Sequence, residues 1–341
     1  MSLATISKKL TPESLKPIYY LYGTEAYLVN QFLMNVHNAL FTGEDGELND
    51  VRHLLADTPL TDIIEEAETF PFFSAKKMVV IQDFYLATSQ KSSSKIEHDL
   101  TILEAYLDQP SEQTVLIIVS PYEKLDERKR ITKRLKKEVE TIDINPLMES
   151  DLYKWIDGYL KNNSFVMDSD AKQELYERIG SNLMLIYQEL AKCMLYKGDS
   201  KHITKEDIVT MVSETIEQSV FAVVEFTAAG QAGQALETYH RLLRQKEEPL
   251  AILALLTRQF RIFHQVKLRQ EKGYSQKEIA SQLKLHPYVV KLASQRLRSF
   301  GKDTLKKALV ACNETDFSIK TGKVEKERAV ELLLIQLSQA T

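Results

Sequence analysis

Five short apolar runs, separated by segments with helical spacing, constrain the fold of the first 144 residues. The strongest run is Val115–Val119, in which every residue is β-branched or leucine. Runs of this length and composition are typical of buried strands. Because strands and helices alternate, we expect a parallel sheet covered by helices on both faces. The predicted strands are Pro17–Tyr22, Val51–Leu55, Met78–Ile81, Val115–Val119 and Glu138–Ile144.

The segments between these runs predict helices. Ala26–Ala39 carries apolar residues every four positions, which is the spacing of one helical face. Thr61–Phe70 has the same character and is followed by Pro71, which cannot continue a helix. Leu100–Leu107 predicts a third helix in this part of the chain.

The rest of the chain predicts helices only. Gly (11) and Pro (9) together make about 6% of the residues, half the usual share of about 12%, which favours long regular elements. The predicted fold class is therefore mainly α with an N-terminal α/β domain, divided into residues 1–144, 145–213 and 214–341. The later helices are predicted at Asp151–Leu160, Ser169–Ile179, Leu183–Tyr196, a short one ending at Val212, Val220–Ala229, Gln231–Arg244, Pro249–Lys272, Gln276–Leu283, Tyr288–Phe300, Asp303–Phe317 and Glu325–Ser338.

Charge is distributed unevenly along the chain, although the formal net charge is only −4. Residues 241–341 hold 20 Lys and Arg against 10 Asp and Glu, so residues 1–240 hold 24 basic against 38 acidic residues. A basic end indicates contact with a nucleic acid or an acidic partner. A Lys-rich helical domain without such a partner would have the same composition, and both interpretations stay open.

The sequence contains no motif for nucleotide hydrolysis or metal chemistry. A phosphate-binding loop needs Gly-x-x-x-x-Gly-Lys-Ser/Thr after the first strand, whereas Gly23–Leu28 reads Gly-Thr-Glu-Ala-Tyr-Leu. There is no Gly-x-Ser-x-Gly turn, and none of the seven histidines has an i, i+4 partner histidine or an adjacent cysteine. We expect no catalytic residue, no cofactor, no metal site and no intrinsic enzyme activity.

Cysteine usage and hydropathy indicate the compartment. Cys193 and Cys312 are the only cysteines, which excludes a disulfide framework and suits a reducing cytoplasm. No apolar run reaches the roughly 18 residues of a membrane span, and residues 1–9 lack the apolar core of a signal peptide. We therefore expect a cytoplasmic protein with no membrane contact.

Aromatic residues stand in a predicted turn between a helix and a strand. Pro71 ends the helix, and Phe72 and Phe73 follow it before the strand at Met78. Rigid aromatic side chains on an exposed turn are typical of anchors in protein–protein interfaces. The alternative is that both rings are buried beneath the sheet.

Each of two further segments has two interpretations, one as a nucleic-acid-binding element and one as a purely structural element. Residues 276–298, opened by a capping box of Ser275 and Glu278, have the spacing of a DNA-reading helix-turn-helix. Two packed helices of an all-helical domain would show the same pattern. Residues 123–137 contain eight basic side chains, and helical spacing places several of them on one face. This face would approach phosphates, or the segment would simply form an exposed amphipathic helix.

Several segments, taken together in their order and spacing, form a recognisable pattern. They are Pro17–Leu28, Phe72–Ile81, Leu183–Tyr196, Ile203–Asp207, His286–Tyr288, Gln295–Arg296 and, most specifically, Asp316–Gly322. The pattern resembles the delta subunit of the bacterial DNA polymerase III clamp loader over nearly the full chain. The first segment looks like the family's first strand and turn, and the second like its hydrophobic pair, basic residues and strand. The third and fourth segments resemble the second domain, and the last three resemble the collar domain.

The resemblance implies an AAA+-like α/β domain without a phosphate loop, a small helical lid domain and an all-helical collar domain for oligomerisation. It implies a non-ATPase subunit that binds the sliding clamp (the beta subunit) and opens its ring for loading onto primed DNA. The implied partners are the ATP-binding and delta-prime-type subunits of the loader, with primed DNA contacted through the assembled complex. Any enzyme activity would be that of the DNA polymerase III holoenzyme in the bacterial replisome.

The family's clamp-contacting pair, a Leu-Phe or similar apolar dipeptide, falls on Phe72 and Phe73. The implied clamp-binding residues are Phe70, Pro71, Phe72 and Phe73. Phenylalanine in place of leucine changes the shape that the clamp pocket has to accept. Two other functions stay open: a DNA-binding regulator that uses residues 276–298, and an ATPase that acts alone.

Overall fold

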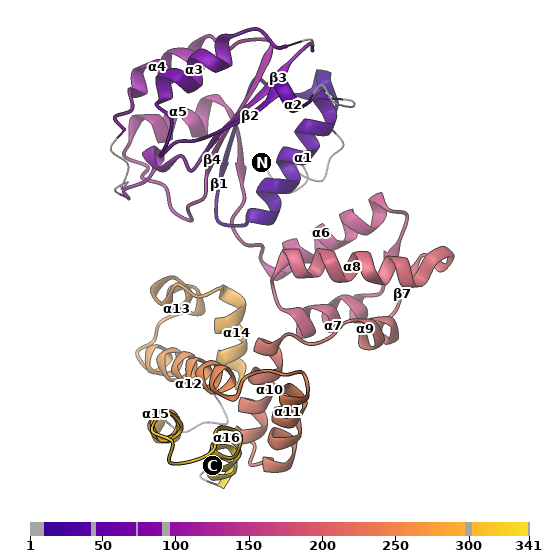
Figure 1. Cartoon of the computed structure of the whole chain (residues 1–341), viewed down its shortest axis with the longest axis vertical. Helices are drawn as coiled ribbons and strands as arrows, with labels where there is room; N and C mark the ends of the chain where they lie inside the picture. Colours follow the sequence, from indigo (N-terminus) through magenta and orange to yellow (C-terminus); the bar gives the residue numbers. More distant parts are fainter. Residues whose placement is uncertain (1–9, 42–45, 73, 91–95, 297–301, 340–341) are drawn as a thin grey trace. The chain divides into compact units, whose positions relative to one another are not determined.

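The structure is a computed structural model that describes residues 10–41, 46–72, 74–90, 96–296 and 302–339. The chain divides into two compact units, residues 1–162 and 163–341 (Figure 1). Within the described ranges, no helix is both long enough and apolar enough to cross a membrane.

A five-stranded parallel sheet forms the centre of the first unit. Its strand order is β2-β3-β4-β1-β5, so β1 lies between β4 and β5, with Tyr19 opposite both Ile117 and Glu140. The five predicted strands are confirmed, with differences of one or two residues at their ends. The strands are β1 (Ile18–Tyr22), β2 (Asp50–Leu54), β3 (Lys77–Gln82), β4 (Thr114–Ser120) and β5 (Glu140–Asp143).

Helices cover both faces of this sheet, as the sequence predicts (Figure 1). Alternate strand residues such as Ile18 and Tyr20 enter one core with α3, α4 and α5. On the other face Tyr19 meets Phe32 of α1, with ring centroids 5.0 Å apart. The helices of this unit are α1 (Ala26–Leu40), α2 (Gly46–Asn49), α3 (Leu60–Glu68), α4 (Leu100–Asp108), α5 (Arg130–Glu138) and α6 (Glu149–Asn162).

The second unit begins with three helices and a small pair of strands. The sequence predicts only helices between residues 145 and 213, but β6 (Val166–Met167) and β7 (His202–Ile203) pair in parallel there. Two residues per strand are too few to show a period of two, so the pattern could not reveal them. The helices are α7 (Ser169–Ile179), α8 (Leu183–Lys197) and α9 (Lys205–Met211).

The C-terminal helices share one core. Helix α10 begins four residues before its predicted start, because the Thr215 hydroxyl caps it by accepting a hydrogen bond from Gln218 N at 3.3 Å. The predicted fold class, mainly α with an N-terminal α/β domain, is confirmed. The AAA+-like type of that domain and the boundaries at 144/145 and 213/214 stay predictions. The helices are α10 (Ile216–Ala228), α11 (Ala232–Arg244), α12 (Pro249–Glu271), α13 (Gln276–Leu283), α14 (Pro287–Arg296), α15 (Lys302–Lys320) and α16 (Lys326–Gln339).

Candidate functional site

A cavity of about 330 Å³ opens at the carboxyl ends of β1, β3 and β4, the edge where open α/β sheets bind ligands. Its charged group is Asp83, whose carboxylate accepts a hydrogen bond from the Tyr122 hydroxyl. None of the described residues that line it is Lys or Arg, so the cavity offers phosphate a carboxylate and no cation. The lining residues are Gly23, Thr24, Ala26, Val29, Asn30, Leu33, Gln82, Asp83, Val119 and Pro121.

The turn between β1 and α1 is packed against backbone and leaves no cradle for a phosphate group. Gly23 has φ +134°, and a Cβ atom there would lie 2.4 Å from both Asn145 N and the Ile144 carbonyl carbon. Gly23 N donates a hydrogen bond to Ser120 O at 3.0 Å. Glu25 N donates to Ile144 O, also at 3.0 Å, so this amide faces the backbone of its own fold.

Residues 69–76 connect α3 to β3 at the opposite, amino-terminal edge of the sheet and carry the predicted interface anchors. Phe70 and Phe72 expose 82% and 59% of their surface, and Pro71 is half-buried. Phe73 lies outside the described residues. For Phe72, the structure decides against the alternative that its ring is buried beneath the sheet.

The preceding helix ends two residues earlier than predicted. Helix α3 ends at Glu68, and Thr69 is extended, with its amide donating to Glu65 O at 3.1 Å. Proline disfavours the helical conformation at the residue that precedes it. Pro71 therefore excludes Phe70 from the helix as well as ending it. The consequence is a longer connection, in which Phe70 belongs to the loop with Phe72.

Two buried polar side chains hold this loop, and sequence analysis identified neither of them. The Lys77 ammonium, with the residue 2% exposed, donates to Glu66 O and lies 3.1 Å from the Glu66 carboxylate. A cation at the C-terminal end of α3 is favoured by the helix dipole. The second is Asn49, whose side-chain amide is hydrogen-bonded to the backbone of Phe72.

Reactive groups do not gather elsewhere in the part of the chain that the structure describes. Within those residues no three His, Cys, Asp or Glu side chains are placed to hold a metal ion. Cys193 and Cys312 are both buried and free. Burial raises the pKa of each thiol to about 11, so neither is a ready nucleophile at neutral pH.

Comparisons with known proteins identify the family. The family model described as "DNA polymerase III, delta subunit" matches residues 19–145, and that described as "DNA polymerase III delta subunit, C-terminal domain" matches residues 217–337. The DNA polymerase III subunit delta of Bacillus subtilis (strain 168) is 34% identical over 330 residues, 97% of this chain and 95% of that protein. The chain belongs to the DNA polymerase III delta subunit family.

A solved structure agrees with this assignment. The Bacillus subtilis DNA clamp loader delta protein matches with a TM-score of 0.85 and 34% identity, covering 98% of this chain and 99% of that one. A match of this extent includes both compact units. The delta subunit family therefore accounts for the whole fold and not for one domain alone.

Half of the basic side chains in residues 123–137 of this delta subunit are paired with carboxylates of the same fold. Helix α5 begins only at Arg130, so the segment is not one continuous helix. Four of its eight basic side chains lie in ion pairs, which favours the plain structural interpretation over phosphate binding. The pairs are Arg128–Asp126 (2.9 Å), Arg130–Glu104 (3.1 Å), Arg134–Glu138 (2.8 Å) and Lys136–Glu127 (2.5 Å).

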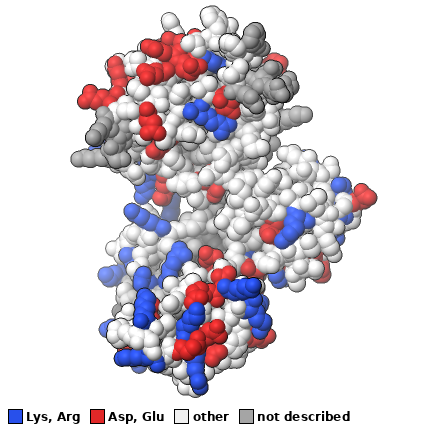
Figure 2. Space-filling view, viewed as in Figure 1, with Lys and Arg blue, Asp and Glu red and all other residues white. Residues whose placement is uncertain are grey.

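Charge on the surface follows the uneven distribution in the sequence. On the face drawn in Figure 2, acidic side chains gather over the upper part of the first unit, where α3 and α4 lie. Lys and Arg side chains are frequent on the C-terminal helices in the same view (Figure 2). Contact with an acidic partner or a nucleic acid at that end stays a prediction.

The segment with helix-turn-helix spacing forms two short helices, α13 and α14, joined at Lys284 with φ +53°. Its apolar residues Ile279, Ala280, Val290 and Ala293 are buried in the core of the C-terminal helices. The family match places residues 276–298 inside the region that corresponds to the family's C-terminal domain. The side chain of residue 296 and residues 297 and 298 lie outside the described part.

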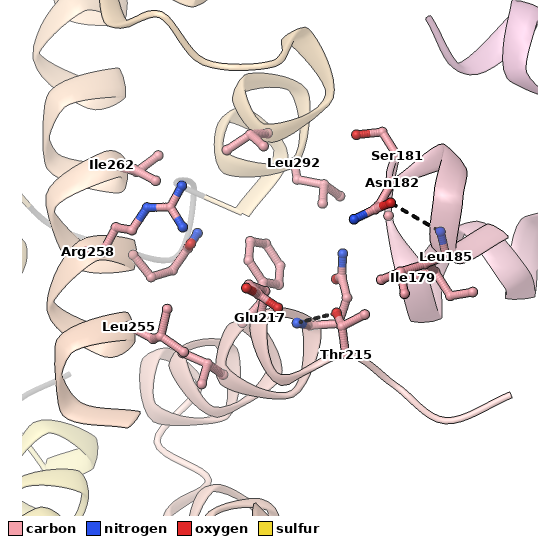
Figure 3. A pocket seen from close by; sticks show the side chains of 16 residues that line it. Ile179, Ser181, Asn182, Leu185, Thr215, Glu217, Leu255, Arg258, Ile262 and Leu292 are labelled. Atoms are coloured by element: carbon pink, nitrogen blue, oxygen red, sulfur yellow. Dashed lines mark hydrogen bonds between the residues drawn. The ribbon is translucent and has the colours of Figure 1, made fainter. Parts of the chain in front are cut away.

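A second cavity, of about 420 Å³, lies between the α7–α8 turn and helices α10, α12 and α14 (Figure 3). Arg258 and Glu217 reach toward it from α12 and α10 with opposite charges (Figure 3). Asn182 and Thr215 also line it, and their side chains cap α8 and α10 by accepting hydrogen bonds from Leu185 N and Gln218 N. Asn182 and Thr215 thus serve the ends of α8 and α10, and we assign no ligand to this cavity.

Proposed function

We propose that this delta subunit binds the sliding clamp through Phe72 and Phe73, with Phe70 and Pro71 beside them, and opens the ring for loading onto primed DNA. The observation that carries the proposal is the exposure of Phe70 (82%) and Phe72 (59%) on a loop whose ends are fixed. Large exposed rings on a held backbone lose little conformational freedom on binding, and aromatic residues dominate interface energetics.

The same proposal makes the chain a non-ATPase subunit of the loader. The cavity at the carboxyl edge of the sheet is lined by one carboxylate and by no described cation, which does not suit a triphosphate. Other subunits, of the ATP-binding and delta-prime type, would therefore supply the energy of the cycle. Primed DNA would be contacted through the assembled complex in the cytoplasm.

Assembly with those subunits is assigned to the C-terminal helices. Val310 and Phe317 are 51% and 59% exposed, and a spacing of seven residues places them on one face of α15. Exposed apolar residues on one helix face are typical of interaction surfaces. We propose this face as part of the collar through which the loader subunits associate.

The test is the affinity of the full chain for the purified sliding clamp of the same cell. Phe72→Ala with Phe73→Ala should weaken binding at least about 30-fold, because an aromatic anchor is worth about 2 kcal/mol and 1.4 kcal/mol is tenfold. The melting temperature should change little, since an exposed ring contributes little to the core. Leu195→Ala, at a residue 85% exposed on α8, is the matched control and should leave affinity unchanged.

Two results would contradict the proposal. Unchanged clamp affinity in the double variant would remove these residues from the interface. A large fall in melting temperature would show that the two rings pack in the core, where each truncation lowers the free energy of unfolding by about 3–5 kcal/mol. Tight binding of one duplex sequence by the free chain at about 150 mM salt would instead favour a DNA-binding regulator.

A further inference from the structure

The backbone of Phe72 is paired with a buried side chain far away in the sequence. Phe72 N donates a hydrogen bond to Asn49 Oδ1 at 2.7 Å, and Asn49 Nδ2 donates to Phe72 O at 2.7 Å. The two bonds use both the N–H and the C=O group of Phe72. The side-chain amide of Asn49 therefore pairs with Phe72 as the backbone of a neighbouring strand would. Asn49 is 1% exposed, whereas Phe72 is 59% exposed.

Asn49 is itself held by the rigid part of the fold. It is the last residue of α2 and directly precedes Asp50, the first residue of β2, which lies opposite Met78 of β3. The Asp50 carboxylate is fixed from two sides, by Arg52 at 2.8 Å and His37 at 2.9 Å. Because Asn49 is anchored next to the sheet in this way, its side chain holds the backbone group that it binds in a fixed position relative to the sheet.

The loop between α3 and β3 needs such a support in its middle. At one end Thr69 is bonded to the last turn of α3, and at the other Lys77 N donates to Gln113 O at 2.9 Å. The aromatic residues stand between these ends, outside helix and sheet. Asn49 therefore holds the backbone at the point from which the Phe72 ring projects.

We infer that Asn49 is the positioning residue of the clamp-binding loop: it fixes the backbone at Phe72 so that the ring is presented already ordered. This inference rests on the proposed function. An ordered ring meets its pocket without the entropy loss of fixing a free loop, so the contribution of Asn49 to affinity depends on the rings it presents.

A comparison of variants in two backgrounds tests the inference with the full chain and the purified sliding clamp. Asn49→Ala should lower clamp affinity about 5–10-fold in the wild-type background. In the Phe72→Ala, Phe73→Ala background it should change affinity by less than about twofold, because the ring that Asn49 positions, that of Phe72, is gone. Both backgrounds keep the backbone groups that Asn49 binds, so the comparison isolates the positioning effect.

A matched control separates positioning from general stability. Thr132 is buried and its hydroxyl donates to Ala87 O at 3.2 Å, which is also a side-chain-to-backbone bond in the first unit. Thr132→Val should lower the melting temperature without changing clamp affinity. Should Asn49→Ala fail to fold, Asn49→Asp keeps the acceptor for Phe72 N and loses the donor to Phe72 O.

Hydrogen exchange supplies a readout that does not involve the clamp. Asn49→Ala should accelerate exchange of the Phe72 amide, while amides of β3 and β4 keep their protection. Equal losses of affinity in both backgrounds, or unchanged affinity together with faster exchange at Phe72, would overturn the inference. Unchanged affinity in the Phe72→Ala, Phe73→Ala protein alone would instead overturn the proposed function, so the two failures are distinguishable.

Discussion

The Glu25 carboxylate accepts a hydrogen bond from Tyr27 N at 3.3 Å and thereby caps the N-terminus of α1. In a phosphate-binding α/β fold, the amides at this helix end point at the ligand. Here a negative side chain of the protein itself takes that place, beside a cavity whose charged group is another carboxylate, Asp83. The electrostatics of this edge are therefore the reverse of those that a triphosphate requires.

The first prediction is that the isolated chain does not bind ATP with magnesium at micromolar concentrations. The reason is the Glu25 cap together with a cavity lining that lacks described cations. Isothermal titration calorimetry of the full chain should show no saturable heat, while an ATP-binding loader subunit measured in the same buffer serves as the positive control. Saturable binding in the micromolar range would show that another part of the chain supplies the phosphate contacts.

The second prediction concerns the pH dependence of stability at Glu25. Burial raises the pKa of this carboxyl group, so the folded state favours its protonated form, and the stability it contributes is lost as the pH rises through the folded-state pKa. Glu25→Gln keeps the acceptor for Tyr27 N and cannot ionise. The variant should therefore be more stable than the wild type at pH 7.

The difference should be small, roughly a few tenths of a kcal/mol, because Glu25 is only partly buried and water screens it. It should disappear near pH 3, about one unit below the ordinary pKa of Glu, where the carboxyl group is protonated in both states. Urea unfolding of both proteins at the two pH values measures it. A wild type that is more stable than Glu25→Gln at pH 7 would show that the ionised cap is net favourable.

The third prediction is that Gly23→Ala destabilises the first unit by at least about 2 kcal/mol. A Cβ atom would meet the backbone of residues 144 and 145 at 2.4 Å, and φ +134° is strained for any L residue. Gly158 in α6 is the control, because a Cβ there meets nothing within 4 Å. Gly158→Ala should stabilise by about 0.5–1 kcal/mol, and equal effects in urea unfolding would show that the turn can relax.

Local patterns predict the central strands β1, β3 and β4 well because these strands are buried on both faces. Every residue of β4 is buried, and its run of Val, Leu and Ile is visible without any knowledge of its neighbours. The strands β6 and β7 are not predicted, because two residues are too few to show the alternating pattern of a strand. The early start of α10 at Ile216 depends on the Thr215 cap, a signal that is present in the sequence but weaker than hydrophobic spacing.

The candidate site is likewise only partly predictable from the sequence: some of its features depend on neighbouring residues and others on contacts between distant segments. The aromatic turn at Phe72 follows from the adjacent proline and from the strand that begins after it, so it is visible locally. The role of Asn49 depends on a contact across 23 residues, for which a single sequence carries no signal. Lys77 reads as an exposed basic residue, and only the end of α3 packed beside β3 explains why its ammonium is buried.

The last prediction separates assembly from clamp binding. Truncation before α10 is a poor test, because Arg178 of α7 donates to Val212 O at 2.9 Å and Thr215 N donates to Arg178 O at 3.0 Å, so a cut there divides one compact unit. Substitutions on the exposed face of α15 avoid this problem. Val310→Asp with Phe317→Asp should leave the fold intact, since both side chains are more than half exposed.

The double variant should lose association with the other loader subunits by more than about tenfold, because buried carboxylates without partners are costly in an apolar interface. Clamp affinity should stay unchanged, since Phe72 lies in the other compact unit. Leu195→Asp adds the same charge to an apolar residue that is 85% exposed on another helix, α8, and serves as the control. Co-purification of the full-length variants with the loader subunits measures assembly, and retained association in the double variant would place the collar contact on another face.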